Sequence, residues 1–105
     1  MKWEIESLTE ELSNFEISFF ELTEVSPKSR KTKRLCFDAV NYIINNSELV
    51  DIIMNKHILP IKEITDNIKL NRKDIERHRK YIITAVIAIT QDYPAIAEYF
   101  NMREV

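Results

Sequence analysis

Residues 61–80 read IKEITDNIKLNRKDIERHRK, a run that combines two helix-like segments with a short break between them. Asn71, at the break, is a favoured N-cap residue, and Asp74 three residues later suits the positive end of a helix dipole. The apolar anchors on the two sides of the break are Ile64, Ile68, Leu70 and Ile75. Their spacing is typical of two helices that pack across each other after a tight turn, which predicts a helix-turn-helix within about residues 61–90.

The segment after the break has two different faces. With 100° per residue, one face holds the side chains of Ile75, His78, Ile82, Ala85 and Val86. The opposite face is mostly charged and holds Arg72, Lys73, Glu76, Arg77 and Lys80. No helix breaker occurs before Thr90, so we expect one continuous helix over 72–90. An apolar face that packs on the domain, opposite a long basic face, is typical of a recognition helix that enters the major groove of DNA.

The polar side chains of this stretch are therefore candidates for contacts to DNA. The first residues of a recognition helix lie deepest in the groove, so we expect base contacts from Asn71, Arg72, Lys73, Glu76 and Arg77. Arginine can donate two parallel hydrogen bonds to guanine O6 and N7, and a glutamate can accept one from a cytosine amine. We expect contacts to the phosphate backbone from Lys69, Arg79 and Lys80.

A further basic cluster lies upstream and comprises Lys28, Arg30, Lys31, Lys33 and Arg34. These cations lie at the start of a predicted helix, where they oppose the helix dipole and cost stability unless an anion offsets them. One interpretation is a second contact to DNA phosphates that fixes the register of the domain on the duplex. The other interpretation is pairing with the glutamates of residues 4–24. Both can hold, one in the bound state and one in the free state.

The charge of the chain is unevenly distributed. The chain has 105 residues, which suits one domain, and its net charge of −2 by itself argues against nucleic acid. However, residues 1–25 carry seven acidic side chains and one lysine, whereas residues 28–80 carry thirteen basic and seven acidic side chains. The sequence thus predicts an acidic arm, a basic middle and a mildly acidic end, and the basic middle suits a polyanionic partner.

The composition excludes several classes of protein. Glycine is absent, which excludes Gly-rich phosphate loops and the usual hairpin turns of β proteins. Cys36 is the one cysteine, and neither His57 nor His78 has the spacing of a metal ligand. We therefore expect no catalytic site, no cofactor and no metal site. The apolar run Tyr81–Ile89 is too short to span a membrane, so we expect a cytoplasmic protein without membrane insertion.

The pattern as a whole predicts an all-α, compact bundle of about six helices. The expected helices cover residues 3–15, 29–45, 48–56, 61–68, 72–90 and 94–101, with a further short one at 19–25. Asn45 and Asn46 are expected to end the helix before them in the left-handed conformation that glycine usually supplies. Lys69 stands in the turn of the helix-turn-helix, where glycine is common. Either Lys69 or Asn67 is therefore expected to be left-handed, or the turn to be rearranged.

Several stretches of the chain form a recognisable pattern, namely residues 17–19, 25–28, 59–64, 71–83, 92–94 and 98–99. The most specific of them is IERHRKYII at residues 75–83. Together they cover nearly the whole chain and resemble the C-terminal domain of the sigma-I family of bacterial RNA polymerase sigma factors. In that family we expect serine and threonine where this chain has Asn71 and Asp74, and glycine where it has Glu16.

This resemblance implies sequence-specific binding to the −35 element of promoters as part of an alternative sigma factor in transcription initiation. It implies that the chain is a piece of a longer sigma factor, whose N-terminal domain binds the −10 element and the RNA polymerase core. It also implies regulation by the cytoplasmic N-terminal domain of a membrane-anchored anti-sigma factor, in response to extracellular polysaccharide or to heat.

The expected organisation is then one monomeric DNA-binding domain over residues 1–105. Its parts are an acidic helical arm at 1–25, helical support at 28–57, the helix-turn-helix at 59–80 and C-terminal helices at 81–105.

Two other functions fit the same sequence. The acidic arm, with Phe19 and Phe20, can form a docking surface for the anti-sigma factor, and this role can coexist with DNA binding or exclude it. The helix-turn-helix can also belong to a transcriptional repressor, which usually binds palindromic DNA as a dimer. Binding to promoter duplex that weakens steeply with salt favours DNA contacts, whereas a stable dimer in solution favours a repressor.

Overall fold

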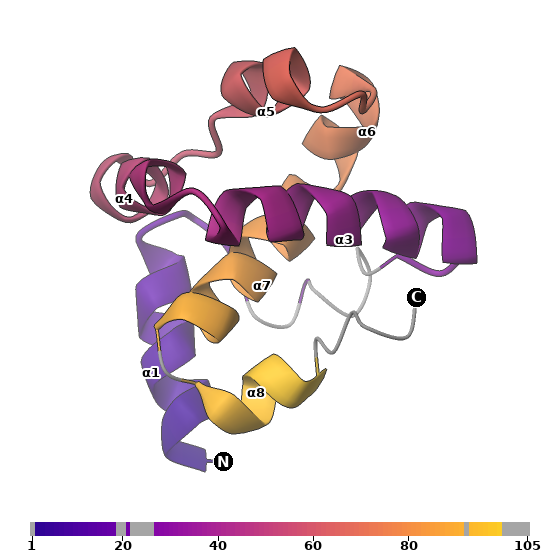
Figure 1. Ribbon diagram of the computed structural model, residues 1–105. Coiled ribbons are helices and arrows are strands. Elements are labelled where there is room, and N and C mark those ends of the chain that lie inside the picture. The colour runs from indigo at the N-terminus through magenta and orange to yellow at the C-terminus, as the bar shows by residue number, and fades with distance from the viewer. Residues whose placement is uncertain (1, 19–20, 22–26, 92, 100–105) are drawn as a thin grey trace.

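The computed structural model describes residues 2–18, 21, 27–91 and 93–99, and Figure 1 shows how they are arranged. In chain order the helices are α1 (Lys2–Ser13), α3 (Arg30–Ile44), α4 (Ser47–Lys56), α5 (Ile61–Asn67), α6 (Arg72–Arg77), α7 (Arg79–Thr90) and α8 (Pro94–Tyr99). None of the described residues belongs to a strand. The predicted all-α bundle is therefore confirmed. The short helix expected at 19–25 falls mostly on residues outside the described part.

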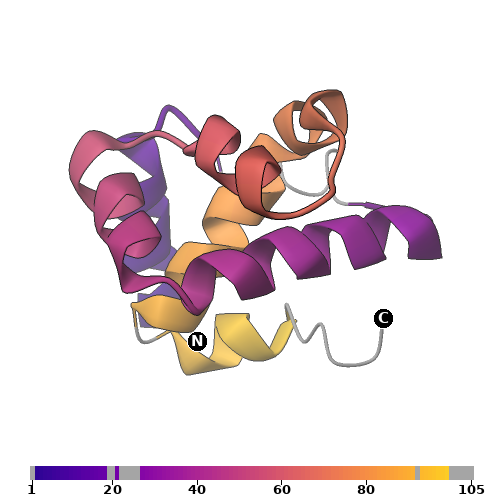
Figure 2. The same cartoon turned by 45° about the horizontal axis from the view of Figure 1, so that its top comes forward.

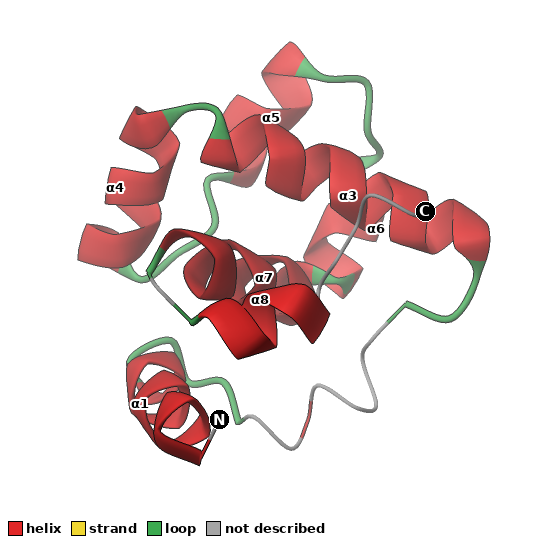
Figure 3. Ribbon diagram, turned by 60° about the horizontal axis from the view of Figure 1, so that its bottom comes forward, coloured by secondary structure: helices red, strands yellow, loops and turns green. Residues whose placement is uncertain are grey.

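Helix α7 forms the centre of the molecule. Its residues Ile82–Ala88 are all buried, and Thr84 among them donates its hydroxyl to the Lys80 carbonyl at 2.8 Å. A helix buried on every side has to be surrounded by other elements. Helix α3 packs along α7, α8 packs against it elsewhere, and α1 packs against α8, as Figures 1 and 3 show from two sides.

Helix α3 connects this centre to the helix-turn-helix. Its buried residues Cys36, Ala39, Val40 and Ile43 follow helical spacing, and the helix packs against α4, α5, α6 and α7. Helices α5 and α6 lie on the side of α3 away from α8, and they are in contact with each other (Figure 2). Ile64 and Ile75 are both fully buried, which confirms them as the anchors of the predicted helix-turn-helix.

The continuous helix expected over 72–90 is wrong, because the chain breaks at His78. This residue has φ −106° and ψ 19°, outside the helical region, and it separates α6 from α7. Neither proline nor glycine lies at the break. Helix α6 packs on α3 and α5, whereas α7 passes through the centre of the bundle. Both helices pack on α3, but α6 also packs on α5 and α7 also packs on α8, and this tertiary packing overrides the local helical preference.

Left-handed backbone lies at other positions than the sequence analysis expected. Within the described part of the chain, φ is positive only at Glu16 (60°) and His57 (57°). Asn45, after α3, has φ −88° and ψ 2°, so the expected left-handed asparagine at this helix end is wrong. Asn46 instead donates its side-chain amide to the Tyr42 carbonyl at 2.7 Å. This bond supplies a partner to one of the last carbonyls of α3, which a helix leaves unpaired.

The turn of the helix-turn-helix is rearranged rather than left-handed. Ile68 ends α5 in an extended conformation, with φ −132° and ψ 148°. The N–H of Leu70 donates to the Ile68 carbonyl at 2.9 Å, which closes a γ-turn centred on Lys69. Because φ of Lys69 is not positive, this is the common inverse γ-turn, and a lysine fits where glycine is usual.

Candidate nucleic-acid interface

Helix α6 and its N-cap expose every side chain that was assigned to base contacts. Ile75 is fully buried and holds the helix on the core. The exposed residues are Asn71, Arg72, Lys73, Glu76 and Arg77. The predicted N-cap is confirmed, because Asn71 Oδ1 accepts a hydrogen bond from the Lys73 N–H at 2.8 Å. An exposed polar face over a buried anchor is the arrangement that entry into a DNA groove requires.

Most of the cations on this face have no ion-pair partner among the residues that the structure describes. Arg72 is the exception, because its Nε lies 3.0 Å from Glu76 Oε1 and donates a hydrogen bond to it. Lys73, Arg77 and the exposed Lys69 of the turn form no ion pair with any residue that the structure describes. Three cations around α6 are thus available to an anionic ligand.

The upstream basic cluster lies at the start of α3. Ser29 caps this helix, since its hydroxyl oxygen accepts from the Thr32 N–H at 3.1 Å. The members of the cluster, Lys28, Arg30, Lys31, Lys33 and Arg34, are all exposed. Arg34 pairs with Asp38 one turn later, at 3.5 Å, and its guanidinium lies 5.6 Å from the centre of the Phe37 ring. The other four form no ion pair with the described residues, including those of the acidic arm.

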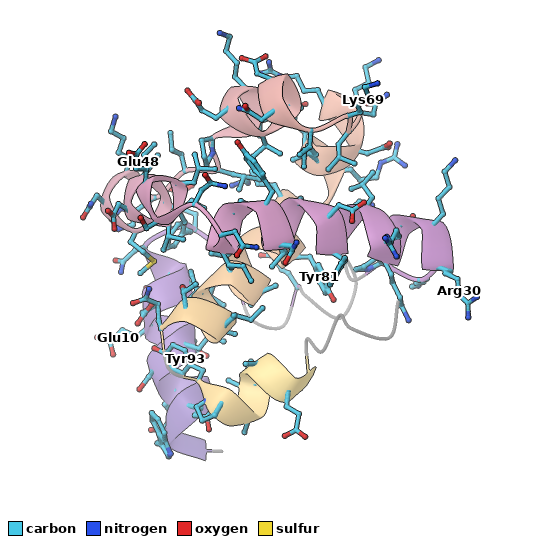
Figure 4. The ribbon with its side chains drawn as sticks, in the orientation of Figure 1. Glu10, Arg30, Glu48, Lys69, Tyr81 and Tyr93 are labelled. Carbon is cyan, nitrogen blue, oxygen red and sulfur yellow. The ribbon has the colours of Figure 1, made fainter. Side chains whose placement is uncertain are left out.

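The two basic regions face outward on the same side of the molecule. Helix α6 packs against α3, and in Figures 1 and 2 it lies towards the end of α3 at which the basic cluster begins. Figure 4 shows Lys69 and Arg30 on this side, with both side chains directed away from the ribbon. The fold therefore brings together two clusters that are about forty residues apart in the sequence.

Arg79 and Lys80 have different surroundings from the α6 residues. Both are half-buried, and they line a groove of about 350 Å³ whose other walls are formed by Asn14, Phe15, Glu16 and His57. Lys80 Nζ lies 2.5 Å from Glu21 Oε2, and this ammonium holds the pKa of the Glu21 carboxyl below its ordinary value. Pairing between the acidic arm and a cation is thus present at Lys80. Among the described residues, it is absent from the cluster at the start of α3.

The acidic arm also has a structural role that the sequence analysis missed. Glu4 is almost fully buried, and its Oε1 accepts from the N–H groups of Ala95 and Ile96 at 3.1 and 3.2 Å, at the start of α8. Glu11 Oε1 accepts from the Tyr93 hydroxyl at 2.8 Å. The sequence spacing could have indicated that Glu4 is buried. Glu4 lies four residues before Leu8, so both side chains lie on the buried stripe of α1.

The cysteine and the two histidines have separate surroundings in the described part of the chain. Cys36 is buried, which raises the pKa of its thiol to about 12, so the thiol stays protonated and unreactive. His57 packs its ring edge-on against Phe15 at 5.1 Å, and His78 lies at the break between α6 and α7. No group of three or more His, Cys, Asp or Glu side chains suited to a metal ion occurs among the described residues.

No helix in the described part of the chain is both long enough and apolar enough to cross a membrane.

Known proteins that resemble the chain are sigma factors. RNA polymerase sigma factor SigI7 of Acetivibrio thermocellus is 42% identical over 98 residues, which are 93% of this chain and 42% of that protein. RNA polymerase sigma factor SigI of Bacillus anthracis is 38% identical over 86% of this chain and 38% of its own length. The Bacillus subtilis SigI is 35% identical over 93% of this chain and 39% of its own length.

No protein-family model matches the chain. The chain spans about two-fifths of the length of the relatives that it matches. These matches confirm the resemblance predicted from the sequence: over nearly all of its length, this chain is related to the SigI-type RNA polymerase sigma factors.

Proposed function

We propose that this chain binds promoter DNA in a sequence-specific manner and recognises the −35 element for an alternative sigma factor. The observation that carries the proposal is the exposed basic surface of α6 and of the turn before it, which lies towards the cationic start of α3. On this surface Lys69, Lys73 and Arg77 form no ion pair with any described residue. On this proposal Asn71, Arg72, Lys73, Glu76 and Arg77 face base edges in the major groove.

The other basic side chains bind the phosphate backbone. Lys69 and the cluster Lys28–Arg34 flank α6, so they contact phosphates on either side of the groove that α6 enters. Cations that oppose the dipole of α3 in the free protein are offset by phosphates in the complex. Arg79 and Lys80 add phosphate contacts, and Lys80 first has to leave Glu21.

The proposal is tested by comparing Arg77→Ala with Lys80→Ala in binding to promoter duplex and to random duplex. Loss of a base contact costs about 1–3 kcal/mol on the promoter and relaxes the sequence preference, whereas loss of a phosphate contact weakens all sequences alike. We expect the first result for Arg77→Ala and the second for Lys80→Ala. Equal losses on both duplexes for Arg77→Ala would contradict its role in base recognition.

The salt dependence of binding provides an independent check. Each phosphate contact releases counterions, so affinity should fall steeply as salt rises, and removal of one contact should reduce the slope by about one unit. A chain that fails to bind promoter duplex even at low salt would exclude the proposed function.

The partners follow from the same proposal. The chain acts as one monomeric domain of a longer cytoplasmic sigma factor, and it reaches the RNA polymerase core through the rest of that protein. Its regulator is the cytoplasmic N-terminal domain of a membrane-anchored anti-sigma factor. The assignment to a longer sigma factor is supported by the sigma factors that the chain matches, which extend well beyond it in length. The anti-sigma regulator is what the resemblance of the sequence implies.

A second candidate function is docking of the anti-sigma factor as the main role of the domain. Helix α1 favours it, since Trp3 and Ile5 are 59% and 37% exposed among glutamates. Phe19 and Phe20, which the sequence analysis added to this surface, lie outside the described residues. Mixing the chain with promoter duplex and the anti-sigma domain tests this role. Loss of anti-sigma binding in Trp3→Ala would support docking on the surface around Trp3. Competition between the anti-sigma domain and the duplex would show that docking prevents DNA binding.

A further inference from the structure

One ion pair lies on the exposed face of α6. Arg72 Nε donates to Glu76 Oε1 at 3.0 Å, one helical turn apart, and both side chains remain about half exposed or more. The described residues hold two other ion pairs at this spacing, Lys62–Asp66 at 3.7 Å and Arg34–Asp38 at 3.5 Å. Of these three pairs, only the pair on α6 forms a hydrogen bond, so Arg72 is the most firmly oriented of the three cations.

The position of Arg72 is electrostatically unfavourable without this partner. Arg72 is the first residue of α6, where a cation opposes the helix dipole. Glu76 offsets this repulsion and at the same time keeps the long arginine side chain from sampling many rotamers. A cation that is placed against the helix dipole and then held in place is better explained by an external ligand than by helix stability.

The pairing also determines which edge of the guanidinium is free. Arginine has five N–H donors, one on Nε and two on each terminal nitrogen. Because Nε is occupied by Glu76, the donors that remain are those of Nη1 and Nη2. Two parallel donors of this kind match the O6 and N7 acceptors of guanine.

The other side chains of the face narrow the choice of base. Asn71 could bind adenine only through both its carbonyl and its amide, and its carbonyl already caps α6. Lys73 and Arg77 are donors without acceptor groups. The carboxylate of Glu76 is the acceptor that would suit cytosine, and Arg72 occupies one of its oxygens.

Building on the proposed DNA-binding function, we propose that Arg72 reads a guanine through its terminal N–H groups. Glu76 is then a positioning residue that acts through Arg72, rather than a reader of cytosine. The domain accordingly requires a guanine at the base pair nearest to the start of α6.

The test is selection from a randomised DNA duplex pool by the 105-residue chain, with sequencing of the bound fraction. The variants are Arg72→Ala, Glu76→Ala, Glu76→Gln and the double variant Arg72→Ala/Glu76→Ala. Asp66→Ala is the matched control, because it removes the equivalent ion pair from α5. Circular dichroism verifies that each variant remains helical.

We expect the unaltered chain to select guanine at the position that Arg72 contacts, and Arg72→Ala to lose the preference at that position by about tenfold or more. Glu76→Ala should weaken the preference at the same position, and it should have no further effect in the Arg72→Ala background. Glu76→Gln should keep more of the guanine preference than Glu76→Ala, because the amide oxygen still accepts from Arg72 Nε. Asp66→Ala should leave the selected sequence unchanged.

Two results would contradict the roles given to Arg72 and Glu76 without contradicting the proposed DNA-binding function. One is a further loss of preference when Glu76→Ala is added to Arg72→Ala, which would make Glu76 an independent reader. The other is an unchanged preference in Glu76→Ala. A chain that binds no sequence selectively would instead refute the proposed function, and this assignment with it.

Discussion

Glu16 adopts a backbone conformation that a residue with a side chain disfavours. Its N–H donates to the Ser13 carbonyl at 3.1 Å, and the Ile17 N–H donates to the Leu12 carbonyl at 3.0 Å. This pair of bonds is a Schellman motif, which ends α1 with Glu16 in the left-handed position at φ 60°. Glycine usually occupies this position, and the sequence resemblance led us to expect glycine there.

Replacement of Glu16 by glycine should therefore stabilise the protein. The left-handed region costs a non-glycine residue roughly 1–2 kcal/mol, and part of this is offset by the larger entropy of glycine in the unfolded chain. We expect a net gain of about 1 kcal/mol in the free energy of unfolding, measured by urea denaturation. The control is Glu10→Gly on the exposed side of α1, which should lose about 1 kcal/mol. A loss of stability in Glu16→Gly would contradict the strain argued here.

Single residues were the least predictable feature of the sequence. Because the chain lacks glycine, the usual marker of left-handed backbone was missing, and asparagine was a misleading substitute at Asn45. His57 is left-handed at the end of α4, and its ring contacts Phe15, more than forty positions away. Such a contact forms only when distant segments meet, so no local pattern could reveal it. Lys80 is a similar case, because its pairing with Glu21 depends on the folded arrangement.

At the scale of elements, periodicity located the helices well and their junctions poorly. The expected helices at 29–45 and 61–68 agree with α3 and α5 to within about one residue at each end, because their apolar stripes and cap residues are local signals. The break at His78 has no local signal, since it accompanies tertiary packing in which both helices contact α3 but only α6 contacts α5 and only α7 contacts α8. The exposed face of α6 was predictable, whereas the separate surroundings of Arg79 and Lys80 were not.

The start of α6 offers a test at this scale. Asn71→Ala removes the side-chain cap on the Lys73 N–H and should lower the free energy of unfolding by about 1 kcal/mol. Asn71→Ser should retain most of the stability, because serine is an equally favoured cap. Thermal and urea denaturation measure both. Asn55→Ala, at an exposed position within α4, is the control and should be neutral or slightly stabilising. Equal stability of the alanine variant at position 71 would mean that the cap is unimportant.

At the scale of the whole molecule, the net charge of −2 conceals how the charges are used. One of the two interpretations that the sequence left open was pairing of the glutamates of residues 4–24 with the basic cluster at 28–34. In the structure, Glu4 and Glu11 of α1 instead bind polar groups at the other end of the chain. Glu21 pairs with Lys80, while most of the cations around α6 and at the start of α3 form no ion pair within the described part of the chain. The acidic and basic segments of the sequence thus remain apart in the folded chain, with the glutamates on α1 and the cations around α6 and at the start of α3.

The pair of Glu21 and Lys80 predicts a titration effect. The pKa of the Glu21 carboxyl lies below its ordinary value because it accepts a hydrogen bond from Lys80 and is close to its positive charge. A carboxyl with a lowered pKa in the folded state contributes its stabilisation above the ordinary pKa of 4.5 and loses it as the pH falls through the lowered value. Lys80→Met should therefore raise the midpoint of the Glu21 titration measured by NMR.

Glu98→Gln, which removes an exposed carboxylate of α8, serves as the control and should leave the Glu21 midpoint unchanged. A midpoint that does not move in Lys80→Met would show that the pair does not persist in solution.

The contact between Glu4 and the start of α8 has a mechanical consequence. Because α1 and α8 are the first and last described helices, tension applied through flanking segments would act directly on this contact and on the packing of α8 against α7. Helices α5 and α6 lie on the far side of α3 from α8, and so away from that line of force (Figure 1). In a longer protein, pulling on the domain would then open the seam between α1 and α8 while α5 and α6 kept their shape.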